Sequence, residues 1–355
     1  MLRYAGLTVA LVVAGLALGG SAIARAAALV GETRHIQAEP APPPLLDQLR
    51  GEYRRPDAIP FPQADRYTPD KALLGRMLFH DTRLSGSGTL ACASCHNPGF
   101  GYGDGLARSM GRDLRPLDRR SPSLVNAAWG KLFFWDGRAG SLEEQALAPI
   151  EAPREMDRSL DALVRGVSAI AGYRSLFARA FPGQPVSPDI IAAAIATYER
   201  TLVSGVAPFD AWIEGDEAAI PEAAKRGFRL FNTSARCAAC HGGWNFSDDG
   251  FHDTGLTDGD LGRGALLPRV VKMQHAFKTP GLREVALRAP YLHDGSLPTL
   301  AAVVAAYDAG GIDRPSRSEL VGPLGLSADE QADIVAFLQT LTSAAAPGAE
   351  VPLPR

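Results

Sequence analysis

The sequence contains one five-residue pattern twice, Cys-x-x-Cys-His, at residues 92–96 and 237–241. This pattern is typical of c-type haem attachment, in which both thiols bond to the porphyrin and the histidine becomes the proximal ligand of the iron. The two copies use all the cysteines of the chain, Cys92, Cys95, Cys237 and Cys240. We therefore expect two covalently bound haem c groups, with His96 and His241 as iron ligands.

Paired cysteines also occur in zinc sites and in thioredoxin-like redox motifs. A zinc site needs further soft ligands nearby, and a redox motif needs one pair in a βαβ context. Neither alternative explains a five-residue unit that is repeated together with its histidine. Haem attachment is therefore the favoured interpretation.

The start of the chain is typical of an exported protein. Residues 1–24 resemble a signal peptide, with Arg3, an apolar run over residues 7–18 and a small-residue cleavage site at residues 22–24. We expect cleavage, a periplasmic location and no membrane span in the mature chain, with an uncleaved anchor as the alternative. The net charge of −3 argues against a nucleic-acid partner.

The remaining sequence predicts a mainly α-helical fold. Residues 25–65 are Pro-rich, so we expect an extended N-terminal arm with polyproline character. Helix starts are indicated at Thr68, Ser141, Ser187 and Ser327. No alternating run predicts a strand.

The two haem motifs lie far enough apart for each to have its own domain. With a length of 355 residues, the chain suits about two domains. We expect two cytochrome c-like haem domains with long loops, over residues 66–205 and 206–345, and a tail over residues 346–355.

Several further segments, together with the haem motifs, resemble the bacterial di-haem cytochrome c peroxidase family, in particular its MauG-like branch. The matching segments occur in order at residues 74–79, 134–139, 144–146, 277–280 and 290–295. The resemblance covers most of the chain after the signal peptide. It implies that the first domain is peroxidatic, which means that hydrogen peroxide reacts at the first haem.

The first iron is expected to have an open position. No histidine lies between His96 and His241. By resemblance, the classical members of the family have a loop histidine that blocks this iron until the enzyme is reduced, and the matching residue here is Arg112, whose protonated guanidinium cannot bind iron. The alternative is that the thioether of Met110 binds instead.

By resemblance, Glu155 is the acid/base that moves a proton between the two oxygens of peroxide, and Gln145 positions peroxide or water. General acid–base catalysis typically contributes about 10²–10⁴-fold. From the residue types alone, Glu155 would be a solvated loop charge and Gln145 a surface amide.

The second iron is expected to have a tyrosine ligand. MauG-like proteins have tyrosine at the position of Tyr307, where other members have methionine. A thioether favours ferrous iron, whereas a phenolate favours ferric and higher states, so this haem would store oxidising equivalents. On pattern alone Tyr307 could be a core residue, because it continues a helical stripe of Leu300, Val303 and Val304.

The resemblance implies that Trp135 relays electrons between the haems, although a tryptophan at such a position is usually a core residue. Relatives often hold calcium there through an asparagine and two carbonyl groups. The asparagine position here is Arg120, and the carbonyl positions are Arg288 and Pro290. Calcium is therefore possible but doubtful: either it is absent or Arg120 supplies its charge.

The partner surface of MauG does not carry over. Its surface tryptophan corresponds to Ala235, and Trp244 could substitute for it or pack against the haem. The remaining histidines are expected to be structural or to contact haem propionates, namely His80, His252, His275 and His293.

These features predict a periplasmic di-haem c peroxidase or oxidase. Hydrogen peroxide would react at the open His96 haem, and the haem of His241 and Tyr307 would store oxidising equivalents for an external protein or redox partner. One alternative is a cytochrome c peroxidase that detoxifies peroxide with electrons from a small redox protein. Another is a di-haem electron-transfer cytochrome without peroxide chemistry.

Overall fold

The computed structural model describes residues 45–344 and 353–354. The predicted signal peptide, the arm before residue 45 and most of the predicted tail lie outside the described residues. Within them the chain is mainly helical, as predicted. No helix in this part combines the length and the apolar character that a membrane span requires.

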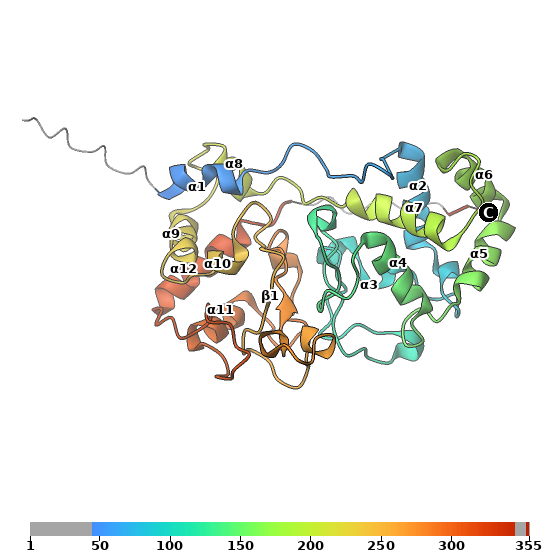
Figure 1. Cartoon of the computed structure of the whole chain (residues 1–355). Coiled ribbons are helices and arrows are strands. Elements are labelled where there is room, and N and C mark those ends of the chain that lie inside the picture. Colours follow the sequence, from blue (N-terminus) through green and yellow to red (C-terminus); the bar gives the residue numbers. More distant parts are fainter. Residues whose placement is uncertain (1–44, 345–352, 355) are drawn as a thin grey trace, which may run out of the picture. The chain divides into compact units, whose positions relative to one another are not determined.

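The elements follow one another along the chain as shown in Figure 1. The α-helices are α1 (Leu45–Tyr53), α2 (Pro69–His80), α3 (Cys92–Cys95), α4 (Leu142–Glu151), α5 (Leu160–Ala169), α6 (Ala171–Ala180), α7 (Pro188–Arg200), α8 (Pro208–Ile213), α9 (Glu222–Asn232), α10 (Ala238–His241), α11 (Leu300–Ala309) and α12 (Ala328–Gln339). The strands are β1 (Phe251–His252) and β2 (Phe277–Lys278), which pair antiparallel with His252 opposite Phe277.

Short 3-10 helices occur in the loops, at η1 (Thr82–Leu84), η2 (Pro98–Phe100), η3 (Arg112–Leu114), η4 (Ala127–Trp129), η5 (Arg263–Ala265), η6 (Val271–Met273) and η7 (Val285–Leu287). The segment from residue 242 to residue 299 contains only β1, β2 and three of these turns. Such long irregular segments can follow the outline of a flat cofactor more easily than regular helices can.

The four helix starts expected from the sequence are confirmed. Thr68, Ser141, Ser187 and Ser327 each accept a hydrogen bond from the backbone N–H three residues later. At Ser327 the Glu330 carboxylate also accepts from the Ser327 N–H at 2.8 Å, which completes a capping box. These caps satisfy backbone donors that have no partner within the helix.

The prediction of an extended arm was wrong for α1. This stretch contains no proline, and its apolar residues Leu45, Leu46, Leu49 and Tyr53 recur at helical spacing. Tyr53 is 1% exposed and its hydroxyl donates to Asn232 Oδ1 at 2.7 Å. Burial of this apolar face, together with the absence of proline, accounts for the helix.

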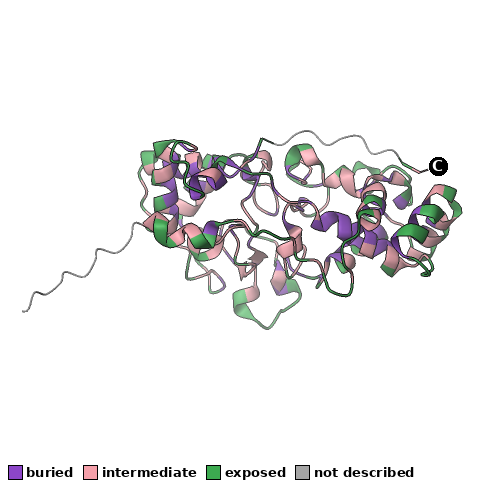
Figure 2. Ribbon diagram, turned by 90° about the horizontal axis from the view of Figure 1, so that it is seen from above, coloured by how far each residue is buried: buried purple, intermediate pink, exposed green. Residues whose placement is uncertain are grey.

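Buried apolar side chains form two clusters. Figure 2 colours all buried residues purple, and many of them lie on the helices. The first cluster extends from Leu74 to Leu202, with α2 packed on α7. The second combines Tyr53 with residues from Phe209 to Leu341, and α9 packs on α12. We therefore keep residue 205 as the proposed domain boundary, because neither cluster uses a residue between Leu202 and Phe209.

The contact between α2 and α7 depends on Gly75. A Cβ added there would overlap the carbonyl oxygen of Ala194 on α7. We expect Gly75→Ala to lower the free energy of unfolding by about 1–3 kcal/mol, because the helices would have to separate. Gly51→Ala is the matched control: a Cβ at Gly51 in α1 meets nothing within 4 Å, and alanine is favoured in helices by roughly 0.5–1 kcal/mol. Chemical denaturation of the holoprotein measures both; equal stability of the two variants would contradict close packing at Gly75.

Candidate active site

One large cavity brings together residues from both clusters of the fold. Its volume is about 1240 Å³, larger than the roughly 300–1,000 Å³ typical of small-molecule pockets. A smaller pocket of about 60 Å³ shares several lining residues with it, including His96, Gln145 and Glu155. Every residue predicted for the site lines one of these two spaces: Cys92, Cys95, His96, Trp135, Gln145, Glu155, Cys237, Cys240, His241 and Tyr307.

The two predicted proximal histidines are held in the same way. His96 Nδ1 lies 3.0 Å from the carbonyl oxygen of Tyr102, and His241 Nδ1 lies 2.8 Å from that of Phe246. A carbonyl oxygen only accepts, so each Nδ1 carries the proton and each Nε2 is left with a lone pair for a metal. Burial lowers the pKa of both imidazoles, which favours this neutral form.

The four cysteines are free thiols in the structure. Burial raises the pKa of each one for which a shift is found, to about 11 for Cys95 and about 12 for Cys237. Cys92 is raised further by the same cause. Cys92, Cys95 and Cys237 therefore remain protonated near neutral pH, and no disulfide removes any of the four cysteines from the haem motifs.

Gln145 and Glu155 come from the two ends of one structural unit, α4 and the loop that follows it. Gln145 is 8% exposed, and its Oε1 is buried without a hydrogen-bond partner. Burial raises the pKa of Glu155, and the guanidinium groups of Arg138 and Arg154 only partly oppose this effect. The unpartnered Oε1 of Gln145 can accept a hydrogen bond from a bound water or peroxide. The raised pKa of Glu155 suits a carboxyl that transfers protons.

Arg112 does not line either space. Its guanidinium is about half exposed and forms an ion pair with Asp157. Met110 lines the smaller pocket together with His96, so its thioether stays an alternative ligand for the first iron.

Tyr307 lies on α11 and lines the cavity together with His241. The stripe that pattern alone assigned to the core faces this cavity, because Leu300, Val303 and Val304 line it too. Burial raises the pKa of the Tyr307 phenol. This shift keeps the phenol neutral while no cation binds it. Tyr307 as a ligand stays a prediction, which its place in the cavity wall supports.

Trp135 contacts segments from both halves of the chain. Its indole Nε1 donates to the carbonyl oxygen of Arg120 at 2.9 Å, and its carbonyl accepts from the Lys278 N–H. Its ring lies edge-on to His293 with 6.4 Å between the ring centroids, and His293 stacks on Phe277 at 3.6 Å. Trp135 is thus fixed where the two halves of the chain meet.

Two family models match the chain: di-haem cytochrome c peroxidase over residues 69–218 and cytochrome c over residues 224–342. The methylamine utilization protein MauG of Methylorubrum extorquens is 52% identical over 299 residues, which cover 83% of this chain and 85% of that protein. The chain belongs to the di-haem cytochrome c peroxidase family, in its MauG-like branch.

This family also includes the cytochrome c551 peroxidase of Pseudomonas aeruginosa, which is 37% identical over 79% of this chain and 80% of its own length. The crystal structure of a MauG-like protein associated with microbial copper homeostasis superimposes with a TM-score of 0.76 at 34% identity and covers 82% of this chain and 95% of that one. The predicted family, mainly helical fold, enzyme class and cofactor are confirmed. This di-haem cytochrome c peroxidase is an oxidoreductase with two covalently bound haem c groups.

The described residues fit two haem c groups. This chain has one large cavity, two histidines with Nε2 free to bind a metal, and four free thiols. The cavity wall also carries buried polar atoms without partners, Gln145 Oε1, Arg120 Nε and Arg288 Nε. A polar atom buried without a partner is costly, so these atoms indicate a missing polar group.

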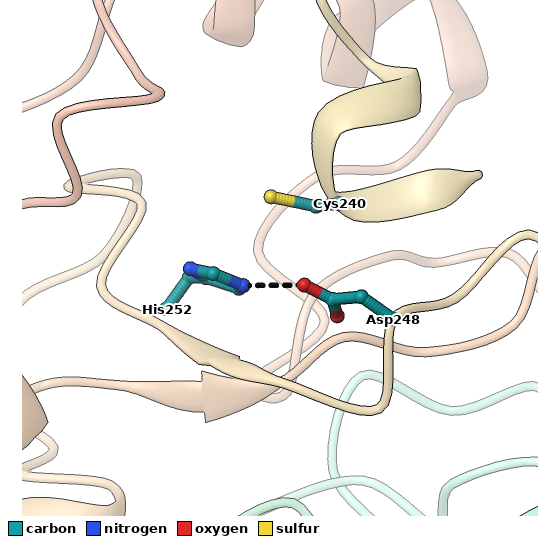
Figure 3. A group of neighbouring side chains, drawn as sticks. All are labelled: Cys240, Asp248 and His252. Carbon is teal, nitrogen blue, oxygen red and sulfur yellow. Dashed lines mark hydrogen bonds and ion pairs between the residues drawn. The ribbon is translucent and has the colours of Figure 1, made fainter.

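One further cluster of possible metal ligands was not expected from the sequence. In Figure 3, Cys240 from α10, His252 from β1 and Asp248 from the intervening loop point toward one another, and His252 Nε2 lies 2.8 Å from Asp248 Oδ2. A metal ion here would compete for a thiol of the second haem motif. We therefore interpret His252 and Asp248 as an ion pair that supports the second haem site, with no ion of its own.

The doubtful calcium site is altered in the way that the sequence suggests. Arg120 Nη1 donates to the carbonyl oxygen of Arg288 at 2.9 Å, so a guanidinium lies against one of the two carbonyl groups that the resemblance assigns to a calcium site. Trp244 lines neither cavity and packs edge-on against Trp129 with 4.7 Å between the ring centroids. This arrangement gives no support to packing of Trp244 against a haem.

Proposed function

We propose that this family member is a periplasmic MauG-like oxidase that uses hydrogen peroxide to oxidise an external protein. The observation that carries the proposal is the difference between the surroundings of His96 and His241. His96 lines the smaller pocket with the half-buried carboxyl of Glu155 and the unpartnered Oε1 of Gln145, whereas the phenol of Tyr307 lies near the second pair of cysteines and lines the large cavity with His241.

His96 and His241 would bind the irons through Nε2, and the cysteine pairs before them would hold the porphyrins. A bound haem c with an open iron position supplies the binding and reduction of peroxide. Glu155 accepts the proton of one peroxide oxygen and returns it to the other, and Gln145 Oε1 accepts a hydrogen bond from peroxide or water. The raised pKa of Glu155 suits both steps, because the group can hold the proton between them.

Tyr307 would bind the second iron together with His241. A phenolate oxygen stabilises the more oxidised states, which makes this site a poor electron acceptor and a good store of oxidising equivalents. Trp135 is the residue that we propose lies on the electron path, because its ring and backbone contact both halves of the chain.

In keeping with the MauG-like branch of the family, we propose that the substrate is a partner protein whose aromatic side chains are oxidised. The docking surface of this chain differs from that of MauG, because Ala235 is a buried alanine. A small redox protein as electron donor is the second candidate, which the likeness to cytochrome c551 peroxidase favours.

The test is to add hydrogen peroxide to the diferric holoprotein and follow it by optical and Mössbauer spectroscopy, beside steady-state turnover with reduced cytochrome c. We expect a rapid reaction with peroxide and slow turnover with reduced cytochrome c. Rapid turnover would favour the detoxifying peroxidase. Absence of any reaction with peroxide would favour the electron-transfer cytochrome and contradict both enzymatic functions.

A further inference from the structure

Among the cavity arginines that are not exposed to solvent, two have no carboxylate partner in the described part of the chain. Arg120 is 6% exposed. Its Nη1 donates to the carbonyl oxygen of Arg288, and its Nε is buried without a hydrogen-bond partner. Arg288 donates from Nη2 to the carbonyl oxygen of Gly281 at 2.6 Å, and its Nε is likewise buried and unpartnered.

Arg108 and Arg236 of the same cavity also lack an ion pair among the described residues, but both are exposed to solvent, whereas the other arginines of the cavity are compensated. Arg119 and Arg138 both pair with Asp136, at 2.7 and 3.0 Å. Arg283 pairs with Asp210 at 2.7 Å. The missing partner is therefore particular to Arg120 and Arg288 among the cavity arginines that are not exposed to solvent.

The acids near the two arginines do not balance their charge. The charge of Asp104 favours the protonated form of Arg120, but the two side chains make no ion pair within 4.0 Å among the described residues. The Glu284 carboxylate already accepts hydrogen bonds from the Ser343 N–H and hydroxyl. Burial, together with the charge of the neighbouring Arg120, lowers the pKa of Arg288 to about 10. A desolvated guanidinium is costly unless an anion compensates it.

We propose that Arg120 and Arg288 form a binding site for carboxylate groups, and that these carboxylates are propionates of the covalently bound haem c groups. Guanidinium is well suited to this chemistry because its planar donors match a carboxylate. The inference rests on the proposed placement of the haem groups in this cavity.

The site also bears on Trp135. The carbonyl oxygen that accepts from the Trp135 indole belongs to Arg120, and the Arg120 N–H donates to the carbonyl oxygen of His293. A carboxylate that anchors the Arg120 side chain therefore fixes the backbone segment on which the orientation of the indole depends.

The test uses holoprotein whose haem carries ¹³C in the propionate carboxyls. Arg120→Gln and Arg288→Gln are compared with wild type by isotope-edited infrared spectroscopy and by redox titration of each haem. We expect the labelled carboxylate bands to shift in both variants and a midpoint potential to fall, because a positive charge is lost near the iron. Arg288→Lys, which keeps the charge, is expected to restore most of the potential and not the bands.

Arg138→Gln is the matched control, because it removes a cavity arginine that already has a carboxylate partner; its labelled bands are expected to match wild type. Unchanged bands in both Arg120→Gln and Arg288→Gln would overturn the proposal. The proposal would also be overturned if added phosphate shifted the midpoint potential of wild type while the labelled bands of the variants stayed unchanged. The two arginines would then bind a free anion instead of a propionate. Haem content per chain confirms that each variant is loaded, and none of these measurements depends on the reaction with peroxide, so failure of the oxidase function would show separately.

Discussion

Replacing Glu155 with glutamine is expected to slow the reaction of the diferric protein with hydrogen peroxide by about 10²–10⁴-fold. Glutamine keeps the shape of the side chain but cannot accept the proton that must leave one peroxide oxygen. No histidine between His96 and His241 is available to take over this task. Stopped-flow absorbance of the Soret band after mixing with peroxide measures the rate.

The pH dependence of the same rate provides an independent check. The carboxylate must be ionised to accept a proton, and burial raises the pKa of Glu155, so the wild-type rate should fall with decreasing pH earlier than an ordinary carboxyl would allow. This limb should be absent in Glu155→Gln. Glu151→Gln is the control, because Glu151 is an exposed residue of α4 that lines neither cavity, and its rate should match wild type. A near-unchanged rate in Glu155→Gln would refute the acid/base role.

The haem motifs and the helix starts could be predicted because both depend on short-range chemistry. A cysteine pair followed by histidine, or a serine three residues before a backbone donor, is visible in a few adjacent letters. Helix α1 was missed because the proline residues on either side of it dominate the composition of the arm. Its apolar stripe depends on Tyr53 reaching a cluster whose other members begin at Phe209.

The features of the site that were not predicted all depend on pairs that are distant in sequence. The edge-on contact of Trp135 with His293, and the contact of Trp129 with Trp244, join residues from opposite halves of the chain. The resemblance identified the carbonyl of Arg288 as a possible calcium ligand. The sequence did not show that the guanidinium of the same residue has no carboxylate partner among the described residues. Whether a charged side chain has an ion-pair partner can be seen only in the three-dimensional arrangement.

Replacing Tyr307 with phenylalanine is expected to change the ferric spectrum of the second haem and to raise its midpoint potential. The substitution removes one oxygen and keeps the ring, so packing along α11 is preserved. Loss of a phenolate ligand removes an anion that stabilises ferric iron. We expect a shift of at least ~59 mV, which is a tenfold change in a one-electron equilibrium. Tyr307→Met should raise the potential as well and restore a six-coordinate spectrum, because a thioether favours ferrous iron.

Tyr291→Phe is the matched control for Tyr307→Phe. Tyr291 lines the same cavity, but its hydroxyl donates to the carbonyl oxygen of Val285 at 3.1 Å and therefore has a structural partner. Optical spectra, electron paramagnetic resonance and redox titration of the three variants separate loss of a ligand from loss of a cavity hydroxyl. A ferric spectrum of Tyr307→Phe identical to that of wild type would remove Tyr307 from the iron. The second haem would then lack the anionic ligand that makes it a store of oxidising equivalents, and the detoxifying peroxidase would become the better account of this chain.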